Sequence, residues 1–166
     1  GFFIPYAFWY VLVVFTLLYM LLYHVEGFRQ FQIFIIVTQA VAMVIYIVYP
    51  NRQDMRPMVF PRENFLTACI GLLYKSDTNT GVCPSLHVAY SMGIASAWLK
   101  EKHVSGWFKA FILVSVVLIC LSTMFIKQHS AMDFFVALPV SLLAEGIAYG
   151  RSYWAVRWKR RRAAKN

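Results

Sequence analysis

The chain has 166 residues, of which 60% are hydrophobic and only 14% are charged, and its formal net charge is +9. Soluble globular domains carry about 25% charged residues, so this composition excludes an ordinary soluble domain and indicates a membrane protein. The three cysteines, Cys69, Cys83 and Cys120, match no metal-ligand spacing, which argues against a structural metal site.

Five apolar stretches predict membrane-spanning helices. A span needs about 20 predominantly apolar residues, and stretches 2–23 and 30–50 meet this length without any charge. The other three, at about 83–99, 110–126 and 134–149, are shorter and need flanking residues or local bilayer thinning to cross. Burial in a soluble core is the alternative for each short stretch. We predict an all-α polytopic membrane helical bundle with five spans, forming a single domain over residues 1–166.

The segment between the second and third stretches has a different character. Residues 64–74 are rich in apolar side chains but too few to span a bilayer, which predicts an interfacial or re-entrant helix. Polar residues at 77–81 follow and predict a turn ahead of Pro84.

The connections between the spans divide the basic residues unequally. If each stretch crosses once, the ends at 24–29, 100–109 and 151–166 share one face, which holds 11 of the 16 lysines and arginines. The positive-inside rule places this face in the cytoplasm. The basic tail 151–166 is then a cytoplasmic anchor touching anionic lipid, and we expect no nucleic-acid binding. The predicted location is the plasma (inner) membrane, with the opposite face extracytoplasmic.

Two short histidine motifs lie on the predicted extracytoplasmic face. Each adjoins an apolar stretch, and an ionisable side chain at the bilayer centre costs roughly 2.5–3.5 kcal/mol. Several such groups gathered there predict a reaction centre at the membrane edge. The motifs are Pro-Ser-Leu-His at 84–87 and Lys-Gln-His at 127–129, the latter followed by Asp133.

The first motif has the features of a helix start. Ser85 follows Pro84 and is a good N-cap residue, with free backbone N–H groups behind it. A helix N-terminus binds anions, phosphate above all, and His87 would lie in the first turn facing that anion. The alternative is that His87 is a satisfied core or capping histidine.

The second motif suits nucleophilic chemistry. His129 and Asp133 are four residues apart, so on a helix they share a face. A carboxylate on one imidazole nitrogen fixes the tautomer and leaves the other nitrogen free to attack. Arg52, Arg56 and Lys127 supply positive charge for phosphoryl oxygens, and the assembly suits phosphoryl transfer. Alternatively, the arginines reach lipid headgroups and Asp133 merely caps the last span.

These motifs resemble the type-2 phosphatidic acid phosphatase superfamily of integral-membrane lipid phosphatases and phosphotransferases. That family carries Lys-x6-Arg-Pro, Pro-Ser-Gly-His and Ser-Arg-x5-His-x3-Asp in this order. Here Arg56-Pro57 matches the end of the first, 84–87 the second, and Ser122-x6-His129-x3-Asp133 the third. The Pro-Ser-Leu-His and Lys-Gln-His variants are similar to the inositol phosphorylceramide synthase-like branch. The resemblance implies a six-helix core, so we expect a further helix before the first visible span.

The resemblance also implies residue roles. His129 would be the nucleophile that forms a phosphohistidine, Asp133 would orient it, and His87 would protonate the leaving group. Arg56, Ser85 and the backbone N–H groups beside it, that of Leu86 included, would hold the phosphate.

Two departures affect the charges of the site. The family lysine of the first motif falls on Tyr49 and the arginine of the third falls on Thr123. Arg52 and Lys127 follow these positions by three and four residues, and helical geometry would place each on the same face. We therefore predict that Arg52 and Lys127 restore the missing charge.

Three functions fit these features: a lipid phosphate phosphatase, a lipid phosphotransferase using the same intermediate, and a noncatalytic membrane protein. The intact histidines and Asp133 argue against the third. The small size and the lack of a large headgroup-binding loop favour the phosphatase, with a lipid phosphate and membrane lipids as its partners. We expect no metal or cofactor, because arginine and lysine already stabilise charge.

Overall fold

The computed structural model describes residues 2–52, 65–76, 80–127 and 129–163, which are almost entirely helical and contain no strand beyond a single bridge between Arg52 and Thr80. The predicted all-α bundle is confirmed. Its elements are α1 (Phe3–Tyr23), α2 (Val25–Val48), α3 (Phe65–Ser76), α4 (Leu86–Lys100), α5 (Gly106–Phe125), α6 (Ala131–Tyr149), the π-helical segment η1 (Gly150–Trp154) and α7 (Ala155–Ala163).

Four helical segments of the described chain are long and apolar enough to cross a membrane: α1, α2, α5 and the continuous stretch Ala131–Ala163. The last is longer than the predicted run at 134–149 because a cap at Ser130 starts it earlier and η1 and α7 extend it. The predicted basic tail is thus helical over 151–163. With 15 residues, α4 rises only about 22 Å, less than the roughly 30 Å of a bilayer core.

Helix α4 forms the centre of the bundle, and it packs against α1, α2, α5 and α6. Trp98 is completely buried and donates a hydrogen bond from Nε1 to Thr16 Oγ1 of α1 at 2.9 Å. At Gly93, a Cβ would lie only 2.7 Å from a ring carbon of Phe34. The missing side chain therefore lets α2 approach α4 closely, as small residues do between membrane helices.

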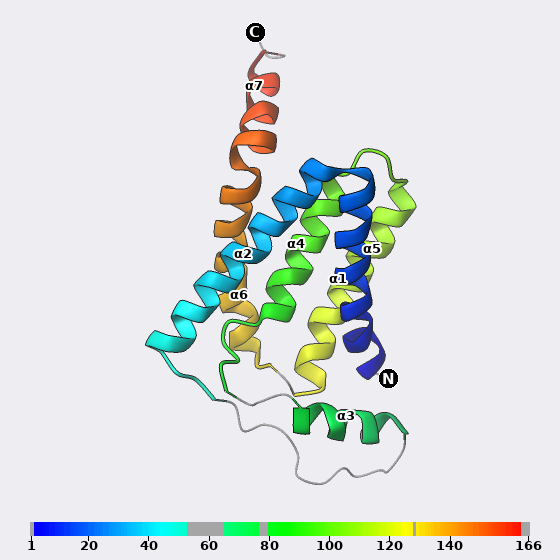
Figure 1. Ribbon diagram of the computed structural model, residues 1–166, viewed down its shortest axis with the longest axis vertical. Helices are drawn as coiled ribbons and strands as arrows, with labels where there is room; N and C mark the ends of the chain where they lie inside the picture. Colours follow the sequence, from blue (N-terminus) through cyan, green and yellow to red (C-terminus); the bar gives the residue numbers. More distant parts are fainter. Residues whose placement is uncertain (1, 53–64, 77–79, 128, 164–166) are drawn as a thin grey trace.

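The connecting segments gather at two ends of the molecule. In Figure 1 the five bundle helices follow the long axis, and the short α3 lies across one end together with the N-terminus. The α1–α2 turn, the α4–α5 connection and α7 lie at the opposite end. This arrangement matches the two groups of connections expected from the sequence, and α3 confirms a helix at the predicted interfacial segment.

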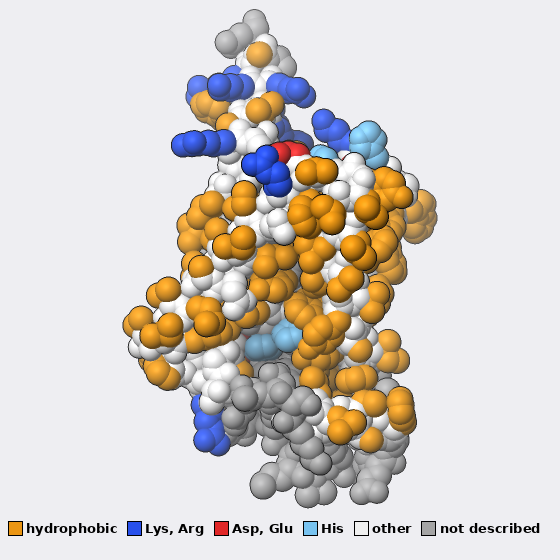
Figure 2. All heavy atoms as spheres, in the orientation of Figure 1, with side chains coloured by type: hydrophobic (Ala, Val, Ile, Leu, Met, Phe, Trp, Pro, Cys, Tyr) orange, Lys and Arg blue, Asp and Glu red, His pale blue; other side chains and the backbone are white. Residues whose placement is uncertain are grey.

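The outer surface of the bundle is apolar. Leu22, Ile47 and Leu142 each keep more than 70% of their surface exposed, and Figure 2 shows hydrophobic side chains over most of one face, with lysines and arginines concentrated around α7. Soluble monomers rarely expose contiguous apolar patches larger than a few hundred Å². This surface and the four apolar helices are those of an integral membrane protein.

A buried carboxylate links two connections at the α7 end. Glu101, only 2% exposed, follows α4, and its Oε2 lies 2.7 Å from Nδ1 of His24 in the α1–α2 turn. Its Oε1 accepts the backbone N–H groups of Lys102 and His103 at 2.8 and 3.0 Å. Burial alone would raise the pKa of Glu101, but these N–H groups and His24 together hold that pKa below its ordinary value of 4.5.

We expect this anchor to make stability pH-dependent. Because the pKa of Glu101 is lower in the folded state, its stabilising contribution is complete above about pH 4.5 and is lost as pH falls through the folded-state pKa. Glu101→Gln should lower the free energy of unfolding by about 1.5–3 kcal/mol at pH 7 and flatten its fall between pH 5 and 3. Thermal unfolding in detergent across this range measures both effects, and an unchanged acid slope in the variant would contradict the assignment.

Candidate active site

The two histidine motifs meet at the end of the bundle near α3. The ring centroids of His87 and His129 lie 5.6 Å apart, although 41 residues separate them in the chain. The backbone N–H of Ser85 donates to the carbonyl oxygen of Asp133 at 3.2 Å, which ties the start of α4 to the start of α6. Figure 2 shows histidine side chains in a recess of the apolar surface at this end of the bundle.

The start of α4 is built as predicted. Ser85 is the N-cap, and its completely buried hydroxyl accepts the N–H of Val88 at 3.4 Å. Leu86 is the first helical residue and His87 the second, so His87 lies in the first turn. The helix dipole and the free N–H groups at this terminus favour a negatively charged ligand nearby.

His129 and Asp133 lie close together, but in a backbone geometry that differs from the predicted one. The expectation that they share a helix face is wrong, because α6 begins at Ala131 and His129 precedes its N-cap, Ser130. Asp133 and Ser130 form a capping box, in which Asp133 Oδ2 accepts the Ser130 N–H at 2.7 Å. The same oxygen lies 3.5 Å from His129 Nδ1. Asp133 therefore caps α6 and also faces His129.

His129 is buried and His87 is half-buried, and each has a buried ring nitrogen with unused hydrogen-bonding capacity. His129 is 9% exposed, and its backbone N–H donates to the carbonyl oxygen of Thr123 at 3.2 Å. Among the described residues, neither His87 Nε2 nor His129 Nδ1 has a hydrogen-bond partner. An unsatisfied buried polar atom costs about 1–3 kcal/mol, and such costs are typical of catalytic groups, whose hydrogen bonds tighten when substrate binds.

Aromatic side chains of α1 surround His87, and sequence analysis missed them. The ring centroids of Trp9 and Tyr6 lie 4.3 and 4.9 Å from that of His87, and Tyr10 lies at 6.4 Å. These rings fix the orientation of the imidazole and make its surroundings apolar. The available signal was the aromatic spacing at the start of the chain, but it is indistinguishable from that of an interfacial belt.

Asn51 is a second contributor that the sequence did not reveal. Its Oδ1 accepts the N–H groups of Val82 and Cys83 at 2.7 and 2.9 Å, and its Nδ2 donates to the Cys83 carbonyl oxygen at 2.9 Å. Tyr46, in the last turn of α2, donates to the carbonyl oxygen of Pro84 at 2.7 Å. The end of α2 thus holds the segment that leads into the cap of α4.

We expect Asn51→Ala to loosen this segment. The variant should lower the free energy of unfolding by about 1.5–4.5 kcal/mol, since each of the three lost hydrogen bonds is worth roughly 0.5–1.5 kcal/mol, and it should reduce turnover more than substrate affinity. Asn51→Asp is the matched control, because it keeps the oxygen that accepts the two N–H groups. Unfolding and steady-state kinetics measure the two variants, and equal losses in both would contradict the role of this oxygen.

The predicted cations do not occupy the helical positions expected for them. Helix α2 ends at Val48 and α5 at Phe125, so the expectation that helical geometry places Arg52 on the face of Tyr49 and Lys127 on the face of Thr123 is wrong. Lys127 is exposed and left-handed, with φ of 55°, directly after the α5 C-cap. Arg52 is exposed and lines a cavity of about 350 Å³ with Tyr46, Pro50, Asn51, Thr80 and Gly81.

Arg56 and Gln128 lie outside the described residues, so the predicted role of Arg56 stays a prediction.

Cys83, beside the α4 cap, is not suited to be the nucleophile. Burial, together with the nearby Asp133 carboxylate, raises the pKa of its thiol to about 11, so the reactive thiolate is scarce near neutral pH. Within the described part of the chain, no three His, Cys, Asp or Glu side chains are grouped to hold a metal ion.

No protein-family model, curated protein or solved structure matches this chain.

Proposed function

We propose that the chain is a membrane-bound lipid phosphatase that hydrolyses a phosphomonoester or diphosphate lipid through a phosphohistidine intermediate. The observation that carries this proposal is the pair of imidazoles whose ring centroids lie 5.6 Å apart, with a carboxylate oxygen 3.5 Å from Nδ1 of the buried one, His129. A nucleophile paired with an orienting carboxylate, with a second acid–base group opposite, is the arrangement that covalent catalysis needs.

In the first step His129 is the nucleophile. Because Asp133 faces Nδ1, the other nitrogen, Nε2, attacks the phosphorus of the lipid phosphate. A P–N bond forms, and the bond between phosphorus and the lipid oxygen breaks. His87 gives its ring proton to that oxygen, so the lipid leaves as an alcohol, or as a lipid monophosphate from a diphosphate.

In the second step water replaces the lipid. His87, now neutral, takes a proton from a water molecule whose oxygen attacks the phosphorus. The P–N bond breaks, inorganic phosphate leaves, and His129 is restored. The N–H groups at the start of α4 stabilise the phosphoryl oxygens, and we propose that Arg52, Arg56 and Lys127 add positive charge at the mouth of the site.

The apolar exterior of the bundle supports a lipid as the substrate. The phosphate of a lipid lies at the depth of the headgroups. A helix that begins at the end of a spanning bundle, as α4 does, places its N-terminal N–H groups at the same depth. The same intermediate serves a lipid phosphotransferase, in which a headgroup alcohol takes the place of water.

The purified protein should release free phosphate from one member of a panel containing phosphatidate, phosphatidylglycerol phosphate, a polyprenyl diphosphate and a sphingoid phosphate. The assay contains EDTA, since we propose that no metal takes part, with glycerol and inositol offered as acceptors. His129→Ala should abolish the release. Transfer of most of the phosphate to an added alcohol would mean that the protein is a transferase and not a hydrolase. No reaction with any lipid would contradict both functions.

We also propose that the histidine site faces the extracytoplasmic side of the plasma membrane, supported by the excess of basic residues at the α7 end. In a protein otherwise free of cysteine, Thr80→Cys should react with an impermeant maleimide on intact cells, whereas Lys102→Cys should react only after permeabilisation. The reverse labelling pattern would mean that the histidine site faces the cytoplasm.

A further inference from the structure

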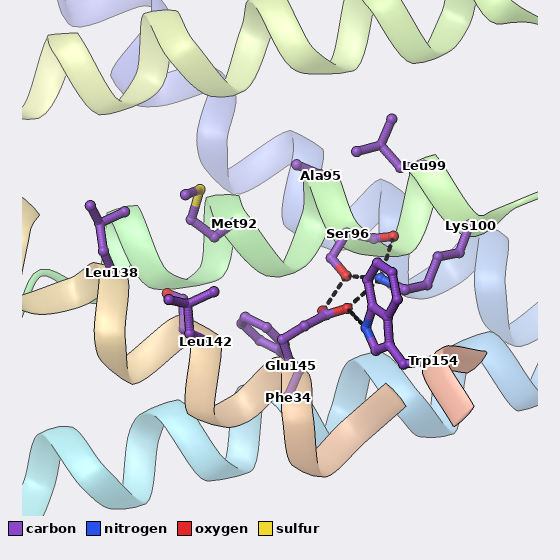
Figure 3. Close-up of a pocket in the computed structure, with 11 residues that line it drawn as sticks. Phe34, Met92, Ala95, Ser96, Leu99, Lys100, Leu138, Leu142, Glu145 and Trp154 are labelled. Atoms are coloured by element: carbon purple, nitrogen blue, oxygen red, sulfur yellow. Dashed lines mark hydrogen bonds and ion pairs between the residues drawn. The ribbon is translucent and has the colours of Figure 1, made fainter. Parts of the chain in front are cut away.

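A second polar cluster lies far from the histidine motifs along α4. A cavity of about 400 Å³ separates α4 from α6, with Phe34 of α2 at its side. Figure 3 shows Met92 and Leu138 at one end of the cavity and Lys100 and Trp154 at the other. Leu138 precedes Glu145 by seven residues on α6, so the apolar part extends for about 10 Å along the helix.

The charged side chains at the polar end of this cavity neutralise each other. The Lys100 Nζ lies 2.6 Å from Glu145 Oε1, and the same carboxylate accepts hydrogen bonds from Ser96 and from Nε1 of Trp154, the latter at 2.7 Å. The Lys100 Nζ also lies 4.1 Å from the ring centroid of Tyr149. The ammonium and carboxylate charges compensate each other, so this cluster does not itself attract an ionic ligand and instead ends the apolar part of the cavity.

Positive charge continues immediately beyond the cluster. Arg157 and Arg161 follow Trp154 by three and seven residues, a spacing that places them on its side of the helical rod. Both are exposed, and Arg157 donates a hydrogen bond to the Tyr153 hydroxyl at 3.0 Å. Leu99 and Leu142 at the cavity wall are 49% and 72% exposed, so the cavity opens on the lipid-facing surface.

We propose that this cavity is a binding site for one anionic glycerophospholipid of the leaflet at the α7 end. One acyl chain lies between α4 and α6 along Met92, Leu138 and Leu142. Its phosphate lies beyond Trp154 and is bound by Arg157 and Arg161. The apolar part of the cavity matches the acyl chain, and the Trp154 indole lies at the level of the interface, where tryptophan is enriched in membrane proteins. The arginines just beyond it match the anionic headgroup.

The site is tested with the purified full chain in nanodiscs that contain phosphatidylcholine and phosphatidylglycerol in equal amounts. Native mass spectrometry then counts the lipids that stay bound after the disc is removed. We expect phosphatidylglycerol to be retained in preference to phosphatidylcholine. Each basic side chain near an anionic lipid is worth about a five-fold preference, so removing both arginines in Arg157→Gln/Arg161→Gln should cut the preference roughly 25-fold.

Two further variants separate the cavity from the charge. Leu138→Trp fills the cavity and should reduce retention although every arginine is present. Leu113→Trp on α5, which is 39% exposed and outside the cavity, is the matched control and should retain the lipid. Arg29→Gln/Lys102→Gln removes two charges from the same end of the molecule and should also behave like the wild type.

Several results would overturn the proposal. Equal retention of the two lipids by the unaltered protein contradicts it whether or not any variant folds. Full retention in a folded Leu138→Trp variant shows that the tail alone attracts the lipid and that the cavity plays no part. Equal losses in both charge-removal variants would show nonspecific attraction to the basic end of the molecule.

Discussion

His87→Gln is expected to slow hydrolysis of an alkyl phosphate lipid by about 10²–10⁴-fold, the usual contribution of general acid catalysis. The reason is that an alkoxide is a poor leaving group and needs the proton that His87 supplies. With a nitrophenyl phosphate, whose leaving group needs no proton, the same variant should lose little rate in forming the intermediate. Steady-state and single-turnover kinetics with the two substrates measure the difference.

His129→Gln provides the contrast, because loss of the nucleophile should abolish reaction with both substrates. His103→Gln is the matched control, since His103 is exposed at the opposite end of the molecule and should leave both rates unchanged. If His87→Gln slowed the two substrates equally, the assignment of His87 as general acid would be wrong.

Lys100→Met is expected to lower the free energy of unfolding by about 3 kcal/mol or more. The variant leaves the Glu145 carboxylate, only 19% exposed, without its ammonium partner, and breaking a buried ion pair from one side typically costs 3–5 kcal/mol. Reversible unfolding in mixed micelles measures this cost. Lys102→Met, at an exposed position two residues beyond the end of α4, should change stability by less than about 0.5 kcal/mol.

The double variant Lys100→Met/Glu145→Gln distinguishes the ion pair from simple packing. Removing both charges should restore most of the lost stability, because neither partner is then left as a buried charge. A double variant as unstable as the sum of the two single variants would mean that the two charges do not interact.

The helices, and the start of α4 at the first histidine motif, could be predicted because local patterns determine them. Uninterrupted apolar runs specify the bundle helices, and Ser85 after Pro84 has the chemistry of an N-cap. The pairing of His129 with Asp133 was predicted with the wrong geometry, because the sequence favours both a continuous helix and a start at Ser130. The capping box decides between them, and its carboxylate still reaches the histidine.

The remaining contributors depend on contacts between distant segments. Nothing near Asn51 indicates that its amide binds the backbone 31 and 32 residues later, or that Trp9 packs on His87. Nothing near Glu145 indicates that it pairs with Lys100, which is 45 residues away in sequence. Side-chain pairing across a bundle follows from helix rotation and tilt, which apolar patterning does not determine.

The most direct test of the account is the identity of the phosphorylated residue. A lipid substrate labelled in its terminal phosphate is mixed with enzyme, quenched during the first turnover at alkaline pH, and the protein is digested and mapped. We expect acid-labile, base-stable phosphate on His129 that appears before free phosphate and is absent from His129→Ala. Phosphate on Ser85, or rapid turnover without any labelled residue, would contradict it.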